Sequence, residues 1–332
     1  RDRENIETKK LPFNGKDYAE FYYQFPNDLE LEKGVPYEFY FQVTDNDAVH
    51  NYKSKKSEVF GYQILTDKEE REKNLNNQEN AIEGMSESLK EMKESNEQMK
   101  QLDQSQREKK QLNYQDKEKL KNFTERQRRQ DELMKSYTEK MKQNLQELKT
   151  DDPFKKELEQ RIEKSQQEIE KDNKLLEELE KYQEKLDKEN LHKQMEELSK
   201  QNTTQQKSLE QLLELTKRYY VEQKAEKIAS DLEELAKEQE KLSLQEEENT
   251  AEAQEELNKD FEDIQKEMDE LEKENEQLKE PMDMPREETQ EDAIKKDQEG
   301  AKEDLEKNEN EENSSSSPQK KSAQQKQKSA AE

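Results

Sequence analysis

The spacing of hydrophobic residues along this chain changes once, at about Asp67. Before that point, apolar and polar residues alternate in three stretches, which are residues 19–25, 37–43 and 60–64. Alternation with period two, in aromatic and β-branched residues bounded by turn formers, is typical of β-strands. Three strands are therefore expected within residues 1–66.

This N-terminal region is rich in aromatic residues but short. It holds 13 of the chain's 21 Phe and Tyr residues, and turn formers separate its strands at residues 26–28, 34–36 and 45–47. A sheet with one apolar face needs a second layer, and an Ig-like sandwich takes about seven strands and ~100 residues. We interpret residues 1–66 as the C-terminal part of an Ig-like β-domain whose earlier strands lie upstream of Arg1. A small sheet capped by the following helices is the alternative.

From residue 67 to residue 280 the apolar residues follow a three-four spacing, and we call each such line of residues a seam. Between Tyr62 and Glu280 there is one glycine, Gly84, and one proline, Pro153, and this scarcity of helix breakers favours long helices. Seams that repeat every seven residues favour coiled-coil packing. The main seam residues are Leu75, Ile82, Met85, Leu89, Met92, Met99, Leu120, Phe123, Met134, Met141, Leu158, Ile162, Ile169, Leu176, Leu179, Met195, Leu198, Leu209, Leu212, Tyr219, Ile228, Leu235, Leu257, Phe261, Ile264 and Leu271.

The seams lose their phase at four places, which are residues 103–116, 149–158, 187–191 and 243–257. These shifts predict four to six helices that fold back as hairpins. Asp152 followed by Pro153 is a strong helix start, and Asn113 with Asp116 is a weaker one. One unbroken rod is the alternative, and it would be about 320 Å long at about 1.5 Å per residue.

Residues 281–332 form a third region with a different composition. Pro281 and Pro285 end the helical pattern. The residues that follow are acidic and nearly without apolar positions, and the last twenty are rich in Ser, Lys and Gln. This composition predicts a tail that is mostly disordered or only marginally helical. The predicted fold class is therefore mainly α, with a short antiparallel β region before the helices and a disordered tail after them.

Composition narrows the function classes further. Only 26% of the 332 residues are hydrophobic, 44% are charged, and the formal net charge is −27. Such an acidic chain is not expected to bind nucleic acid or an anionic membrane surface. The absence of cysteine excludes disulfides and Cys-based zinc sites. No apolar run approaches the ~20 residues of a membrane span, and no signal peptide is visible. Because residue 1 is arginine, we expect an internal fragment of a longer protein.

Few residues are candidates for chemistry. His50 and His192 lie far apart in the sequence, and there is no nucleophile motif, glycine-rich phosphate loop or HExxH motif. Asp45 and Asp47 could hold calcium in a loop, but the EF-hand glycine and glutamate are missing, which favours a simple turn. The sequence therefore predicts no enzyme, no catalytic residues, no cofactor, no metal site and no small-molecule substrate.

Two further features of the helical region admit two interpretations. The cluster at residues 217–220, Lys-Arg-Tyr-Tyr, could hold a phosphate or stack on a base, but Tyr219 also continues the seam of Leu212. Several seam positions are polar, and such residues cost stability while fixing register or partner choice. They predict marginal, dynamic packing that is completed either by a partner or by the missing parts of the chain. These polar positions are Asn96, Gln127, Gln130, Asn144, Ser165, Asp172, Gln183 and Asn202.

Three stretches resemble a domain-of-unknown-function family of large bacterial envelope proteins. They are "YEFYFQVTDNDAVHNYKSKKSEVFGYQILT", "LEQLLELTKRYYVEQKAEKIASDLEELAKEQEKLS" and "PMDMPREETQEDAIKKDQEGAKEDLEK". The most specific part is "LLELTKRYYVEQKAEK", because low-complexity helices resemble many proteins. The resemblance implies N-terminal transmembrane helices outside this chain, an Ig-like region and long coiled coils. It implies a membrane-anchored protein with this region in the periplasm, and it assigns no activity to any residue of this chain.

The leading hypothesis is a non-enzymatic structural or interaction segment of a membrane-anchored envelope protein. It would act through its helical seams, by self-association or by binding a protein partner. One alternative is a ligand-binding module, in which Tyr40 or the loop at residues 45–47 captures a glycan or peptide and the helices space it. Another is a cytoplasmic coiled-coil tether.

Overall fold

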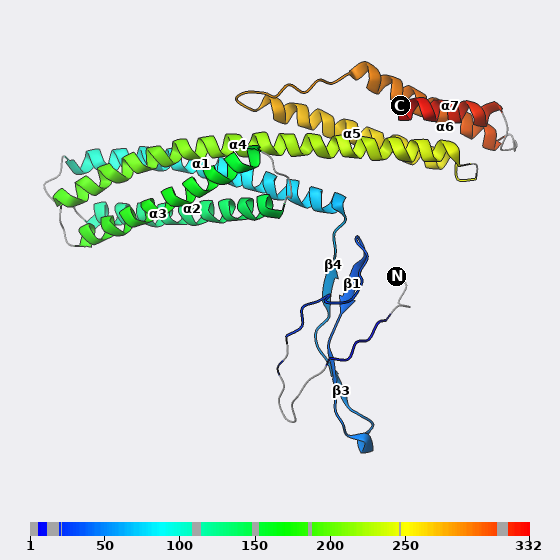
Figure 1. The fold of residues 1–332 in the computed structure, drawn as a ribbon. Coiled ribbons are helices and arrows are strands. Elements are labelled where there is room, and N and C mark those ends of the chain that lie inside the picture. The colour runs from blue at the N-terminus through cyan, green and yellow to red at the C-terminus, as the bar shows by residue number, and fades with distance from the viewer. Residues whose placement is uncertain are drawn as a thin grey trace. The chain divides into compact units, whose positions relative to one another are not determined.

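The computed structural model describes residues 6–11, 20, 22–107, 114–147, 153–184, 188–245, 247–310 and 318–332. Over these residues the chain is mainly helical, with seven α-helices and four short strands (Figure 1). The predicted mainly α fold is confirmed. The chain divides into two compact units, one up to Arg71 and one from Glu72 onward, and each is described by itself.

The N-terminal unit is built around a long β-hairpin with two ladders. Strand β1 (Pro36–Phe39) pairs antiparallel with β4 (Phe60–Gln63), and β2 (Gln42–Thr44) pairs antiparallel with β3 (Ser54–Lys56). The register shifts by one residue between the ladders, which is a β-bulge on the returning strand. At the bulge Ser57 holds both strands, because its Oγ accepts from the Phe41 N–H at 2.9 Å and its N–H donates to the Phe41 carbonyl at 2.8 Å.

The strand predictions are confirmed in part. The second predicted stretch forms β1 and β2, and the third forms β4. The strand predicted for residues 19–25 is wrong over the residues that the structure describes, because Tyr23 and Phe25 lie in no strand. Ala19 and Phe21 lie outside the described residues. The Phe25 ring instead stacks on the Phe39 ring at 4.0 Å between centroids, so this stretch packs by ring contact rather than by a ladder. The Ig-like assignment stays a prediction.

Four helices form the first part of the second unit. They are α1 (Asp67–Arg107), α2 (Tyr114–Glu147), α3 (Pro153–Glu184) and α4 (Lys188–Leu244). Each connection falls where the seams lose phase, so the predicted hairpins are confirmed. Helix α3 begins at Pro153, as the sequence indicates. The capping residue proposed before it, Asp152, lies outside the described residues.

Helix α4 continues beyond the first three helices and joins a second bundle. It has 57 residues, and a rise of about 1.5 Å per residue gives it a length of about 85 Å. Its C-terminal half packs with α5 (Ala251–Glu276) and α7 (Pro318–Ala331), while α6 (Glu288–Asn310) packs with both of these helices. Five helices, α1 to α5, therefore lie within residues 67–280, inside the predicted range.

The prediction of a disordered tail is wrong for the residues described, because α6 and α7 are helices with buried residues. Ala301, Leu305 and Ala323 are each at most 1% exposed and pack with Ala251. Small apolar side chains and buried amides build this core, so it leaves almost no hydrophobic periodicity in the sequence. Residues 311–317 lie outside the description.

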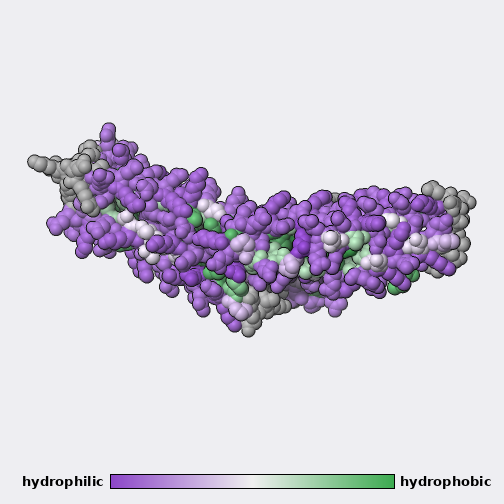
Figure 2. Space-filling view, turned by 90° about the horizontal axis from the view of Figure 1, so that it is seen from above, coloured by the Kyte–Doolittle hydropathy of each residue, from purple (hydrophilic) through white to green (hydrophobic). Residues whose placement is uncertain are grey.

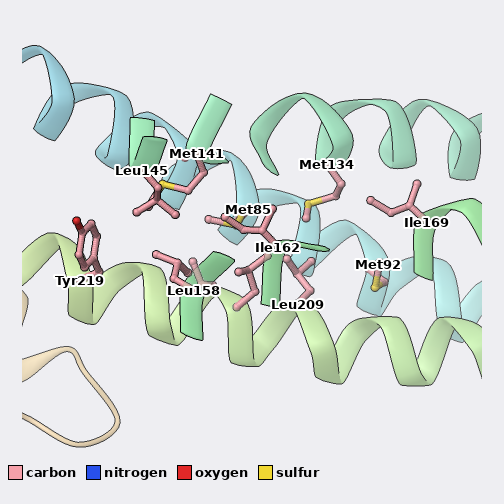
Figure 3. Packing of buried hydrophobic residues seen from close by; sticks show 13 residues of the cluster. Met85, Met92, Met134, Met141, Leu145, Leu158, Ile162, Ile169, Leu209 and Tyr219 are labelled. Carbon is pink, nitrogen blue, oxygen red and sulfur yellow. The ribbon is translucent and has the colours of Figure 1, made fainter. Parts of the chain in front are cut away.

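The seam residues of α1 to α4 point toward one another and form the apolar core of the first bundle. Figure 3 shows Met85, Met134, Ile162 and Leu209 converging from four different helices, and each of them is at most 2% exposed. Hydrophilic residues cover most of the face seen in Figure 2, and hydrophobic ones reach it in narrow patches. The seams are thus buried within a single chain.

One glycine is required by this packing. A Cβ atom on Gly84 of α1 would lie 2.3 Å from the Cζ atom of Tyr137 on α2. Alanine raises helix propensity by about 1 kcal/mol relative to glycine, but overpacking costs ~1–3 kcal/mol. We therefore expect Gly84→Ala to lower the free energy of unfolding by about 1 kcal/mol, measured by urea denaturation. In a Tyr137→Ala background, the same change should instead stabilise the protein. Stabilisation by Gly84→Ala alone would contradict the contact.

Candidate functional site

Five polar side chains link all four helices of the first bundle, and we call them the aspartate layer. The Ser95 hydroxyl on α1 donates to Gln127 Oε1 on α2 at 3.1 Å, and Gln127 Nε2 donates to Asp172 Oδ2 on α3 at 3.2 Å. From α4, Gln205 Nε2 donates to Asp131 Oδ1 on α2 at 3.2 Å. Gln127, Asp131, Asp172 and Gln205 are each at most 3% exposed.

Asp131 and Asp172, which we call the aspartate pair, each keep one carboxyl oxygen without a donor. These oxygens are Asp131 Oδ2 and Asp172 Oδ1, and both are buried. Burial raises the pKa of Asp131 to about 9, and the negative charge of Asp172 adds to this shift. Burial also raises the pKa of Asp172, to about 6. Both shifts favour the protonated form of a carboxyl group, and the two groups titrate as a pair.

The aspartate layer lies between two apolar clusters. One cluster includes Met92, Met134, Ile169 and Leu209, and the other includes Met99, Leu120, Leu176 and Leu198. On each of the four helices, the residues of the aspartate layer lie in the sequence between a member of one cluster and a member of the other. Because side chains close the site on both sides, the pair lies away from solvent, and electrostatic effects there are strong.

The second bundle has a comparable layer made of amides alone, which we call the amide layer. It consists of Gln239 on α4, Gln254 on α5, Gln298 on α6, Gln327 on α7 and Asn249 before α5, each at most 4% exposed. Gln239 and Gln254 exchange two hydrogen bonds, at 2.8 and 2.9 Å. Gln327 Nε2 donates to Gln254 Oε1 at 2.8 Å, and Gln298 Nε2 donates to Gln239 Oε1 at 3.3 Å. No member of this layer titrates.

Sequence reasoning found part of the aspartate layer and none of the amide layer. Gln127 and Asp172 were predicted as polar seam positions, and they are buried at the layer. Asp131 and Gln205 were missed. The spacing of Gln127, Asp131 and Met134 at intervals of four and three residues was the available signal, because it puts them on one helix face.

Other predicted polar seam positions are also placed. Asn144 Nδ2 donates to Asn74 Oδ1 at 3.0 Å, and Gln78 Nε2 donates to Asn144 Oδ1 at 3.1 Å, which joins α2 to α1. Asn96 Nδ2 donates to Gln206 Oε1 on α4 at 3.1 Å. The Gln183 side chain lies outside the described set. These partners are all within the chain.

The cluster at residues 217–220 is mostly structural. Tyr219 is 0% exposed and belongs to the core of the first bundle, as its place on the seam predicts. The Arg218 guanidinium lies 5.1 Å from the ring centroid of Phe154 on α3. Tyr220 is 8% exposed and packs in the α4–α5 core. The tyrosine rings are therefore not presented for stacking on a base.

The remaining candidates fall in different places. Asp45 Oδ1 accepts from the Asp47 N–H at 3.3 Å and Asp47 Oδ1 accepts from the Val49 N–H at 3.1 Å, which is the turn that the sequence favours. His192 Nδ1 lies 2.6 Å from Asp103 Oδ1, between α4 and α1. Tyr40 is 41% exposed, with the Lys56 ammonium 4.3 Å from its ring centroid.

Two observations of the described ranges bear on metals and membranes. In those ranges no three His, Asp or Glu side chains come close enough together to hold a metal ion. Within the same ranges, no helix has both the length and the apolar composition of a membrane span.

The fold and its two layers define a helical-bundle protein with polar layers in its cores. No family model, curated protein or solved structure matches this chain.

Proposed function

We propose that this chain is a non-enzymatic structural and interaction segment of a membrane-anchored bacterial envelope protein. The observation that carries the structural part is the closure of the seams within one chain, with a polar layer in each bundle. Polar layers of this kind fix the register of packed helices. Helix α4 is shared by both bundles and supplies a long continuous support. The envelope placement rests on the resemblance of the β region and of residues 209–243.

The buried seams also bear on how a partner would bind. Met85, Ile162 and Leu209 are each at most 1% exposed, so they offer no free surface. A partner would meet the charged outer faces of the helices, or it would displace one helix from its bundle. The excess of Asp and Glu, 86 against 59 Lys and Arg, favours a partner with a basic surface through electrostatic steering.

The location can be tested in cells that produce the full-length parent protein. An epitope tag is inserted after Ser317, between α6 and α7, the cells are converted to spheroplasts, and protease is added from outside. We expect loss of the tag while a cytoplasmic marker protein stays intact. Protection of the tag until the membrane is lysed would reject the periplasmic placement and favour a cytoplasmic tether.

A further inference from the structure

The aspartate layer contains an incomplete chain of hydrogen bonds. One oxygen of each carboxyl group is satisfied, because Asp172 Oδ2 accepts from Gln127 and Asp131 Oδ1 accepts from Gln205. The other two oxygens, Asp131 Oδ2 and Asp172 Oδ1, are buried and have no donor, although the side chains of the two residues interact directly. Two ionised carboxylates in this position would repel each other.

A single proton resolves this arrangement. Placed on Asp131 Oδ2, it lets Asp131 donate to Asp172 Oδ1, and the hydrogen bonds then run without a break from Ser95 on α1 to Gln205 on α4. We propose that the aspartate pair is a proton-binding site whose occupancy makes the stability of the α1–α4 bundle depend on pH. The amide layer gives the α4–α7 bundle the same kind of connection without a proton.

Among the described residues, no Lys or Arg is one of the groups that shift the pKa of either aspartate. The charge that acts on Asp131 is that of Asp172, while α1 and α4 contribute the neutral groups Ser95 and Gln205. On α3, one turn before Asp172, Glu168 is another buried carboxyl group, 6% exposed.

Arg128 on α2 already forms an ion pair with another residue. The Arg128 guanidinium pairs with Glu180 at 2.9 Å. Since no described cation is among the groups that shift either pKa, the pair reduces its charge from −2 to −1 by binding one proton.

The direction of the pH effect follows from these pKa values. Both carboxyl groups have a higher pKa in the folded chain than in the unfolded chain, where Asp titrates near ~3.9. The folded chain thus binds more protons, and stability falls as pH rises. Between about pH 4 and 6 both groups contribute to this loss of stability, and between about pH 6 and 9 Asp131 alone contributes to it. Each bound proton changes the unfolding equilibrium constant about tenfold per pH unit within its window.

The test is hydrogen–deuterium exchange on the whole 332-residue chain at several pH values from 6 to 9, with rates corrected for intrinsic exchange. We expect protection in peptides from α2 and α3 to fall about tenfold per pH unit while the pair loses its proton. Peptides from α5 to α7 serve as the internal reference, and their protection should change much less.

The matched variant is Asp131→Asn, which replaces the bound proton with a permanent N–H donor to Asp172. It should abolish the pH dependence in α2 and α3 and exceed the natural chain in protection at pH 8. Should this variant fail to fold, Asp172→Asn provides the same test with the roles reversed. Unchanged relative protection from pH 6 to 9 in the natural chain would overturn the proposal, and so would an undiminished pH dependence in the folded Asn variant.

Discussion

Replacing Tyr219 with alanine is expected to lower the free energy of unfolding of the first bundle by about 3–5 kcal/mol. The side chain is 0% exposed and lies in the same apolar cluster as Leu158 and Leu209 (Figure 3). Its removal takes a large aromatic surface out of the core and leaves a cavity that the rigid helices cannot fill. Because whole domains are stable by only about 5–15 kcal/mol, this change would approach the limit of folding.

Urea denaturation followed by far-UV circular dichroism measures this effect, and Tyr114→Ala is the matched control. Tyr114 begins α2 and is 80% exposed, so its removal should change stability by no more than about 0.5 kcal/mol. Equal effects of the two changes would show that Tyr219 is not a core residue. The pair of variants thus separates the structural interpretation of residues 217–220 from a phosphate-binding or base-stacking one.

The parts of the fold that could be predicted are those with strong hydrophobic periodicity. Helices α1 to α4 carry large seam residues, and each change of seam phase became a connection. The start of α3 at Pro153 was readable because a missing N–H costs nothing in the first turn. Helix α7 could not be found this way, since the residues it buries are Lys320, Ala323 and Gln327. Two of these three are polar, and only neighbouring helices show that they are covered.

The polar layers show the same limit from another side. A polar residue on a seam, such as Asp172, is visible in the sequence. The sequence analysis interpreted such a residue as a weak point in the packing that a partner would complete. The structure pairs it instead with residues of α2 within the same chain. Sequence spacing places a residue on a helix face, but it does not state which residue of another helix faces it. The partner of Asp172, which is Asp131, therefore needed the tertiary arrangement.

The two layers give one chain two bundles with different sensitivities. Both layers join four helices through side-chain hydrogen bonds, but only the aspartate layer contains ionisable groups. Since α4 contributes Gln205 to one layer and Gln239 to the other, it runs through both. A rise in pH would therefore weaken the bundle at one end of α4 while the other end stays packed.

Replacing Gln254 with alanine is expected to destabilise the second bundle by about 3 kcal/mol or more. Gln254 is 0% exposed and makes four hydrogen bonds at 2.8–2.9 Å, two with Gln239, one with Gln327 and one with Asn258. Its truncation removes the acceptor Gln254 Oε1 from the buried N–H groups of Gln239 on α4 and Gln327 on α7. Glu256→Ala, two residues away on the exposed face of α5, is the control, and it should be nearly neutral.

A second change at the same position distinguishes lost hydrogen bonds from added charge. Gln254→Glu keeps the size of the side chain but removes its N–H donors and places an ionisable group in the amide layer. Burial would raise the pKa of that carboxyl group, so the folded chain would bind a proton and stability would fall as pH rises. Hydrogen exchange should then show pH-dependent protection in α5 to α7, where we expect the protection of the natural chain to change much less with pH. If Gln254→Glu were neutral at all pH values, the amide layer would be open to water, and the contrast between the two bundles would fail.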